Sequence, residues 1–330
     1  MSRPSPTHAA TERAGLLFAG LCAALGAFSP GFAKLTTNAL DGLSVAVVTT
    51  AFAALAGLAL LALRGELARL GDRRALPRLA AMGALGTGGA FFLFFQGAQR
   101  TSAIETALCL QVEPAYSLLL AHAVLGHRIT GRRMAAAAGI LVGIALALEP
   151  RGLSGALGVA CLLATPLCWQ LSHLIALRGL PAVDPRVFAT ARYVFGGALL
   201  AAVFAARAVA GGGPPASTVA AQVPVLALQG VVLSFVGTLL WYETISRLDL
   251  ARATAIVVPS VPVLSLGASF LLLGEVATAR QALGLALAAA GVLAFVTAPD
   301  AARPRAGVPD LHPPTGAEAP AAVAEAGPGD

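Results

Sequence analysis

Apolar stretches long enough to cross a lipid bilayer recur along most of this 330-residue chain. A helix needs about 20 apolar residues to span the hydrocarbon core. The sequence predicts an all-α integral membrane fold with ten transmembrane helices, of which the fifth and tenth are short. The predicted helices cover residues 14–33, 43–63, 76–98, 102–125, 134–148, 153–177, 187–209, 223–242, 253–273 and 282–297.

Charged residues are too scarce for a soluble protein of this size. They make up 12% of the chain, against about 25% in an average soluble domain. So few polar groups could not cover the surface of a soluble fold, which nearly excludes a soluble enzyme. The net charge of +6 and the pI of about 9.8 would suit a nucleic-acid partner. In a membrane protein the same excess usually lies in cytoplasmic loops, so the positions of the basic residues distinguish the two interpretations.

Basic residues gather on one side of the predicted topology. If the N-terminus is cytoplasmic, all but five of the 22 Lys and Arg residues lie in or near cytoplasmic loops. The five on the outer side are Lys34, Arg100, Arg151, Arg207 and Arg280. This asymmetry is typical of membrane proteins. We therefore expect both termini in the cytoplasm, and the lipid bilayer rather than a nucleic acid as the partner of the positive charge.

An internal repeat divides the predicted bundle in two. A shift of 148 residues places Thr106, Pro114, Gly126, Thr130 and Gly143 on Thr254, Pro262, Gly274, Thr278 and Gly291, and a shift of 143 places Asp41 on Asp184. Each unit holds five helices, and this odd number inverts the second unit across the membrane, as in many secondary transporters. We predict two inverted five-helix repeats, 14–148 and 149–298, between disordered cytoplasmic segments at 1–13 and 299–330.

Two segments carry a family resemblance. TSAIETALCLQVEPAYSLLLAHAVLGHRIT, followed by GILVG, and the chain from WYETISRLDL to AGVLAF resemble the ends of EamA-type repeats of the drug/metabolite transporter superfamily. The resemblance implies a secondary transporter in the bacterial inner membrane for export or uptake of a small-molecule solute, and of the two directions we expect export. The inverted repeat gives alternating access between its two units a simple origin. Two positions depart from the second unit: His127 stands where it has Glu275, and Thr49 where it has Arg192.

Other functions are weighed against transport. An integral membrane enzyme acting on a lipid or isoprenoid would need acidic or histidine residues clustered at one interface, and no such spacing is present. A non-transporting scaffold would have no reason to keep polar residues at the midplane. No cofactor or metal is expected, because no P-loop or zinc-binding motif occurs. The oligomeric state is not indicated.

Glu113 and Pro114 mark the centre of the predicted fourth helix. A proline there frees a backbone carbonyl, and a buried carboxyl is costly unless it is paired or faces a wet cavity. At helical spacing, Thr106, Glu113 and Ser117 form one polar stripe, with Tyr116 close by. Glu113 would bind solute or carry protons, or it would stay protonated and hold the proline kink. Proton-coupled and uncoupled transport are both open.

The predicted ninth helix offers a matching stripe across the central substrate-binding site. It contains Thr254, Val261 and Ser265, with Ser260 as a further candidate on the same helix and structural helix breaks at Pro259 and Pro262 as at Pro114. Four residues on other helices are further candidates. Arg192 would contact an anionic group, join an ion pair or extend to the interface, Gln170 and His173 would line a vestibule, and Trp241 would stack on solute or anchor the interface. Tyr193, next to Arg192, is expected to point elsewhere.

Overall fold

The computed structural model describes residues 6–125, 129–149, 152–179, 183–245, 247–248 and 250–298. Within these ranges the chain is helical and contains no strand. Most elements are α-helices, with one 3₁₀ segment (η1) and two π-helical segments (η2 and η3). Their bounds are α1 Pro6–Ala39, α2 Gly42–Leu63, η1 Leu67–Gly71, α3 Leu76–Gly83, η2 Ala84–Gly89, α4 Ala90–Arg100, α5 Ala103–Leu110, α6 Glu113–Leu125, α7 Gly131–Ala147, α8 Gly152–Gly179, α9 Pro185–Val209, α10 Ala216–Leu228, η3 Gln229–Val236, α11 Gly237–Ile245, α12 Leu250–Leu273 and α13 Ala279–Val296.

In the described part of the chain, nine helical stretches are long and apolar enough to cross a membrane. They agree with nine of the ten predicted helices, and the chain is a multi-pass membrane protein. The remaining predicted span corresponds to α7, which has 17 residues, so a tenth span stays a prediction. The helical part of the N-terminus was underestimated, because α1 begins at Pro6 and residues 6–13 are helical. Residues 299–330 lie outside the described ranges.

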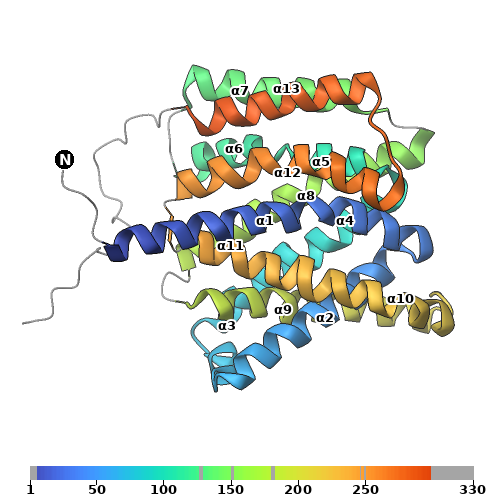
Figure 1. The fold of residues 1–330 in the computed structure, drawn as a ribbon. Helices are drawn as coiled ribbons and strands as arrows, with labels where there is room; N and C mark the ends of the chain where they lie inside the picture. The colour runs from blue at the N-terminus through green and yellow to red at the C-terminus, as the bar shows by residue number, and fades with distance from the viewer. Residues whose placement is uncertain are drawn as a thin grey trace, which may run out of the picture.

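Helices α7 and α13 pack against each other along one side of the bundle (Figure 1). Glycines bring their backbones together. A Cβ added to Gly284 would lie 2.5 Å from the Gly143 carbonyl oxygen, and one added to Gly143 would lie 2.6 Å from the Ala288 nitrogen. Small residues of this kind let membrane helices approach closely.

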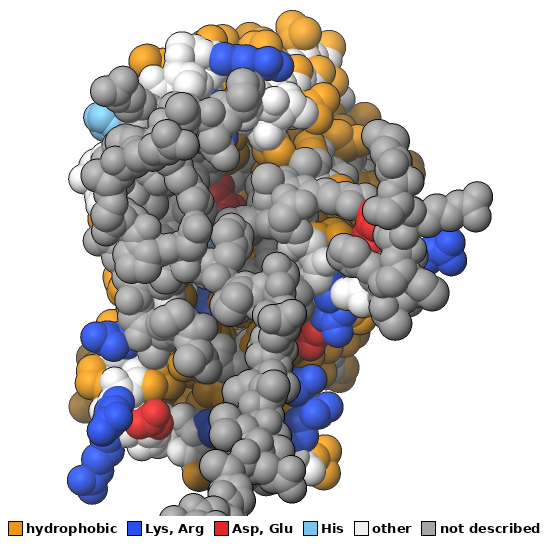
Figure 2. Space-filling model, turned by 90° about the vertical axis from the view of Figure 1, so that its left-hand side faces the viewer, with side chains coloured by type: hydrophobic (Ala, Val, Ile, Leu, Met, Phe, Trp, Pro, Cys, Tyr) orange, Lys and Arg blue, Asp and Glu red, His pale blue; other side chains and the backbone are white. Residues whose placement is uncertain are grey.

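Helix α1 runs from the end of the bundle where the chain begins, here the N-terminal end, to the opposite or distal end (Figure 1). Helix α2 then returns and η1 follows it, so the arginines after Leu63 lie at the N-terminal end. Figure 2 looks onto this end and shows basic side chains around its rim, which are arginines because the one lysine of the chain, Lys34, lies at the distal end. The described arginines of this segment are Arg64, Arg69, Arg73, Arg74 and Arg78.

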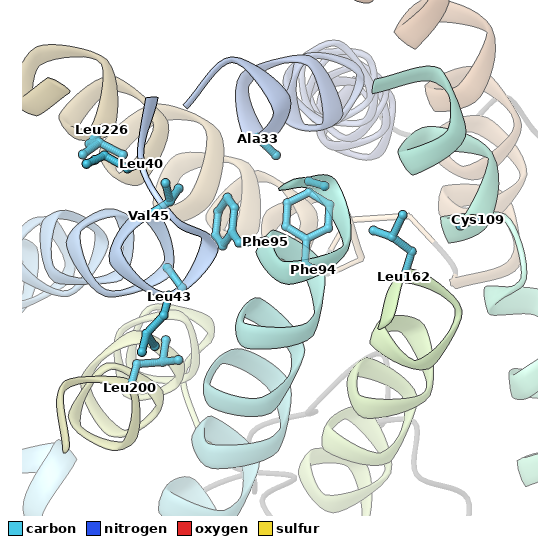
Figure 3. Close-up of a cluster of buried hydrophobic side chains, with 12 residues drawn as sticks. Ala33, Leu40, Leu43, Val45, Phe94, Phe95, Cys109, Leu162, Leu200 and Leu226 are labelled. Atoms are coloured by element: carbon cyan, nitrogen blue, oxygen red, sulfur yellow. The ribbon is translucent and has the colours of Figure 1, made fainter. Parts of the chain in front are cut away.

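A cluster of buried apolar side chains fills the bundle toward the distal end. Phe94 and Phe95 on α4 lie at its centre, between Val45 of α2 and Leu162 of α8 (Figure 3). The same cluster includes residues of α1, α5, α9 and α10, so it joins helices from both predicted units. Its further members are Ala33, Leu40, Leu43, Ala46, Ala98, Cys109, Leu200 and Leu226.

Polar contacts tie the distal end together above this cluster. Asp41 caps α2 by accepting from Ser44 N–H, and Arg207 near the end of α9 donates to its two carboxylate oxygens at 2.6 and 3.1 Å. Burial opposes ionisation of Asp41, but the hydrogen bonds from Arg207 and Ser44, together with the charge of Arg207, outweigh it and hold the pKa of Asp41 below its ordinary value. Glu275 accepts from the first N–H groups of α5, at 3.2 Å each.

Gly284→Ala tests the glycine packing of α7 and α13. The added methyl group would meet backbone atoms of Gly143 and Ala147, so the helices would have to separate. We expect the free energy of unfolding to fall by about 1–3 kcal/mol, which is measured as a lower melting temperature in detergent micelles. Gly139→Ala is the matched control, since a Cβ there would be 4.0 Å from its nearest neighbour. Equal melting temperatures for the two variants would contradict this packing.

Asp41→Asn tests the ion pair with Arg207. Asparagine also caps helices well, so the substitution removes charge and keeps the cap. Because the pKa of Asp41 is lowered in the fold, its stabilisation is complete above the unfolded pKa of about 4 and is lost as the pH falls through the lowered value. We expect the variant to have a free energy of unfolding about 1 kcal/mol lower than the wild-type protein at pH 7, measured by thermal unfolding in detergent. The difference should disappear in strong acid. A deficit independent of pH would contradict an ionic origin.

Candidate functional site: a charged cavity between the helices

A break in the helix after α5 positions Glu113. Helix α5 ends at Leu110, and a turn follows in which Gln111 N–H and Val112 N–H donate to Leu108 and Cys109 at 3.0 and 3.2 Å. Glu113 is then the first residue of α6 and Pro114 the second. Proline is tolerated in a first turn, because its missing N–H would have no partner there. The break thus precedes Pro114 rather than lying at it.

The two π segments face neighbouring residues of α9. Arg192 Nη2 donates to the Gly86 carbonyl oxygen of η2 at 2.8 Å. The Tyr193 hydroxyl donates to the Ser234 carbonyl oxygen of η3 at 2.8 Å and lies 2.7 Å from Thr238 Oγ1. One segment therefore contacts Arg192 and the other contacts Tyr193. Segments of this type often occur at functional sites.

These elements surround a cavity of about 320 Å³. Four of the predicted site residues line it: Glu113, His173, Arg192 and Trp241. Gln170 supports the site from α8, because its Nε2 donates to Glu113 Oε1 at 2.8 Å. Tyr193 points away from Arg192, as predicted, and bonds to η3 rather than η2, but both side chains line the same cavity.

The predicted polar stripe on the fourth helix does not reach the cavity, apart from Glu113. Thr106 is buried and lies 3.0 Å from Thr101 Oγ1. Tyr116 packs against an apolar cluster around Val112, and Ser117 is not among the lining residues. The turn at 111–112 changes the register between α5 and α6, so the helical spacing used for the prediction does not hold across it.

Val261 is the described member of the predicted ninth-helix stripe that lines the cavity, whereas Ser265 and the further candidate Ser260 do not line it. Ser260 and Ser265 donate to carbonyl oxygens of their own helix, at 2.6 and 2.7 Å. The predicted breaks at Pro259 and Pro262 were wrong, because α12 continues through both. The Thr254 side chain lies outside the described part of the structure. Val257 and Val258 line the cavity beside Val261 from the same helix.

Several lining residues were missed from the sequence. Gln111 and Gln229 are polar residues in apolar helices, a signal that could have identified both. The aromatic residues were less distinctive, because rings are common in any membrane helix. They are Phe91, Phe94, Phe95 and Trp169.

The cavity separates two opposite charges. Arg192 is 8% exposed and donates a hydrogen bond to Gly86, whereas Glu113 is bonded to Gln170. Among the described residues, Arg192 Nε and Gln111 Oε1 are buried without a hydrogen-bond partner. Buried polar groups are normally satisfied. A small ligand with an anionic group, a cationic group and an apolar body would match this lining.

A second pocket, of about 480 Å³, lies at the distal end. Its charged residues largely engage one another or the backbone. Arg280 lies 2.8 Å from Glu149, and Glu275 accepts from α5. The central cavity is therefore the stronger candidate site.

Comparisons with known proteins agree with this architecture. The model of the EamA-like transporter family matches residues 13–148 and 156–297. A protein of Streptantibioticus cattleyicolor, described as a probable terminal-alkyne amino-acid exporter, is 30% identical over 260 residues, which cover 77% of this chain and 84% of the relative. A solved crystal structure shares the fold with a TM-score of 0.62 and 19% identity, over 86% of this chain and 97% of that one.

The family match covers most of the chain and falls in two segments, as expected for a protein with two EamA-type units. The protein is accordingly a membrane transporter and not an enzyme. The chain belongs to the EamA-like transporter family.

Proposed function

We propose that this protein exports a small zwitterionic metabolite of the amino-acid type by alternating access. The solute binds in the central cavity between two inverted five-helix repeats, 14–148 and 149–298, with α7 as the fifth of ten spans. The observation that carries the proposal is the pair of opposite charges, Glu113 and Arg192, that line one cavity without bonding to each other.

The lining supports a solute with both charges. A carboxylate would meet the guanidinium of Arg192, whose Nε is unpartnered among the described residues, and an ammonium group would meet Glu113. The rings of Phe91, Trp169 and Trp241 would surround an apolar side chain. The description of the Streptantibioticus relative as an amino-acid exporter supports the same class of solute and the outward direction.

The charge distribution supports a cytoplasmic N-terminal end. Arginine side chains surround this end in Figure 2, as the positive-inside rule requires. We place the protein in the bacterial inner membrane with both termini in the cytoplasm. The distal end is then the outer end, and its apolar cluster and ion pairs correspond to a state closed toward the outside.

Glu113 offers a route for proton coupling. A carboxylate can bind a proton or pair with an ammonium group. It cannot do both at once, because protonation removes the negative charge that attracts the ammonium group. Proton entry from outside would then release the solute, and return of the empty site would carry the proton inward. Such an exchange couples export to the proton gradient.

The class of solute is tested by counterflow in proteoliposomes with radiolabelled propargylglycine, an amino acid with a terminal alkyne. We expect leucine to compete, whereas isoamylamine, which lacks the carboxylate, and isocaproate, which lacks the ammonium group, do not. Competition by either half-molecule as strong as that by leucine would refute a zwitterion site.

Arg192→Gln should lower this flux on the order of tenfold or more, because it removes one partner of a buried charged contact. Arg69→Gln is the control, since it removes a positive charge from an exposed pair with Glu66. Equal flux in both variants would show that Arg192 does not bind the solute.

Glu113→Gln tests coupling separately. The amide cannot take up a proton, so we expect a pH gradient to stop driving flux in this variant while it still drives flux in the wild-type protein. The measurement is initial efflux with and without the imposed gradient. Flux of the variant that still follows the gradient would mean that another group carries the proton or that none does.

A further inference from the structure

Helices α2 and α9 pack antiparallel, and their contacts define a register. At the distal end Asp41 pairs with Arg207. Further along, a Cβ on Gly197 would lie 3.0 Å from Thr50, and a Cβ on Gly57 would lie 2.7 Å from Thr190 Oγ1. Each step along α2 is matched by an equal step back along α9.

The same register continued to the N-terminal end brings Arg64 opposite Asp184. The two residues also correspond in sequence to the distal pair, because the shift of 143 that places Asp41 on Asp184 places Arg64 on Arg207. Both aspartates cap the start of their own helix, and both arginines lie at or near the end of theirs. The two helices therefore carry the same pair of charges at each end.

The structure forms only the distal pair among these described residues. Arg64 is exposed, and in the described part of the chain no ion pair joins it to Asp184. Asp184 instead accepts from Arg186 N–H at 2.8 Å and lies 3.8 Å from Arg186 Nη1. Arg186 also lies 4.0 Å from Glu243, so it has another carboxylate if Asp184 turns to Arg64.

We propose that Arg64 and Asp184 are gate residues that pair when the distal pair opens. The inference rests on the alternating access proposed above. The close contacts at Thr50–Gly197 and Gly57–Thr190 lie between the two ends of the helices, and they form the pivot. When α2 and α9 rock about this pivot, one end closes as the other opens, and each ion pair stabilises one of the two states.

The gate predicts two distances that change in opposite directions. Spin labels at Leu63→Cys and Val183→Cys report the N-terminal end, and labels at Asn38→Cys and Val209→Cys report the distal end. The background carries alanine at the four native cysteines, Cys22, Cys109, Cys161 and Cys168. Distances are measured by double electron–electron resonance in proteoliposomes without solute.

We expect Arg207→Gln to enlarge a short-distance population at the N-terminal end roughly threefold and to lengthen the distal distance. Asp41→Asn, which keeps the helix cap, should do the same. Adding Arg64→Gln to either variant should abolish the short population. Arg69→Gln, which removes a charge at the same end, should leave both distributions unchanged.

The gate would be overturned if the spin-label distance at the N-terminal end stayed single and unchanged in Arg207→Gln and Asp41→Asn. It would also be overturned if Arg69→Gln changed the distance distributions as much as these variants do. Flux of propargylglycine by the wild-type protein in the same liposomes separates this failure from failure of the proposed function. Normal flux with fixed distances refutes the gate alone. Absence of flux with exchanging distances refutes the proposed solute and leaves the gate standing.

Discussion

A guanidinium buried among membrane-spanning helices needs oxygen atoms that accept its hydrogen bonds. In a regular helix the carbonyl oxygens already accept hydrogen bonds from the N–H groups of the same helix. In this bundle a π segment resolves the conflict. The change from i→i+4 to i→i+5 bonding disturbs the backbone around Gly86, whose carbonyl oxygen accepts from Arg192. Gly86 also has to be small, since a Cβ there would lie 2.3 Å from Ser172 Oγ. The position of the positive charge that lines the cavity depends on this contact.

The second π segment extends the same principle. Tyr193 follows Arg192 in sequence, yet its hydroxyl bonds to η3 rather than η2. Two adjacent residues of α9 are thereby fixed against helices from the two predicted units. The geometry of the cavity is set by helix α9 and by the places where its neighbours depart from α-helical bonding.

The helices could be predicted from the sequence because each apolar run has the length that a bilayer demands, and the starts and ends agree within a few residues for most of them. Glu113 and Arg192 could be identified because charges inside such runs are rare. The rest of the two stripes could not, because only Glu113 and Val261 among their described members line the cavity. Helical spacing assumes one continuous helix, and the turn at Gln111 and Val112 breaks it two residues before the proline that suggested a break. Pro259 and Pro262 produce no break at all, since neighbouring packing can hold a helix together around a proline.

The short helices α7 and α13 bear on how the protein fits its lipid surroundings. With 17 and 18 residues, they are about 25 Å and 27 Å long at 1.5 Å per residue, less than the typical hydrocarbon thickness of about 30 Å. Their glycine contacts hold them side by side. With α7 as the proposed fifth span, the mismatch would fall on one flank of the bundle. A bilayer can adapt to such short helices by thinning, so membrane thickness would act on this pair more than on the longer spans around the cavity.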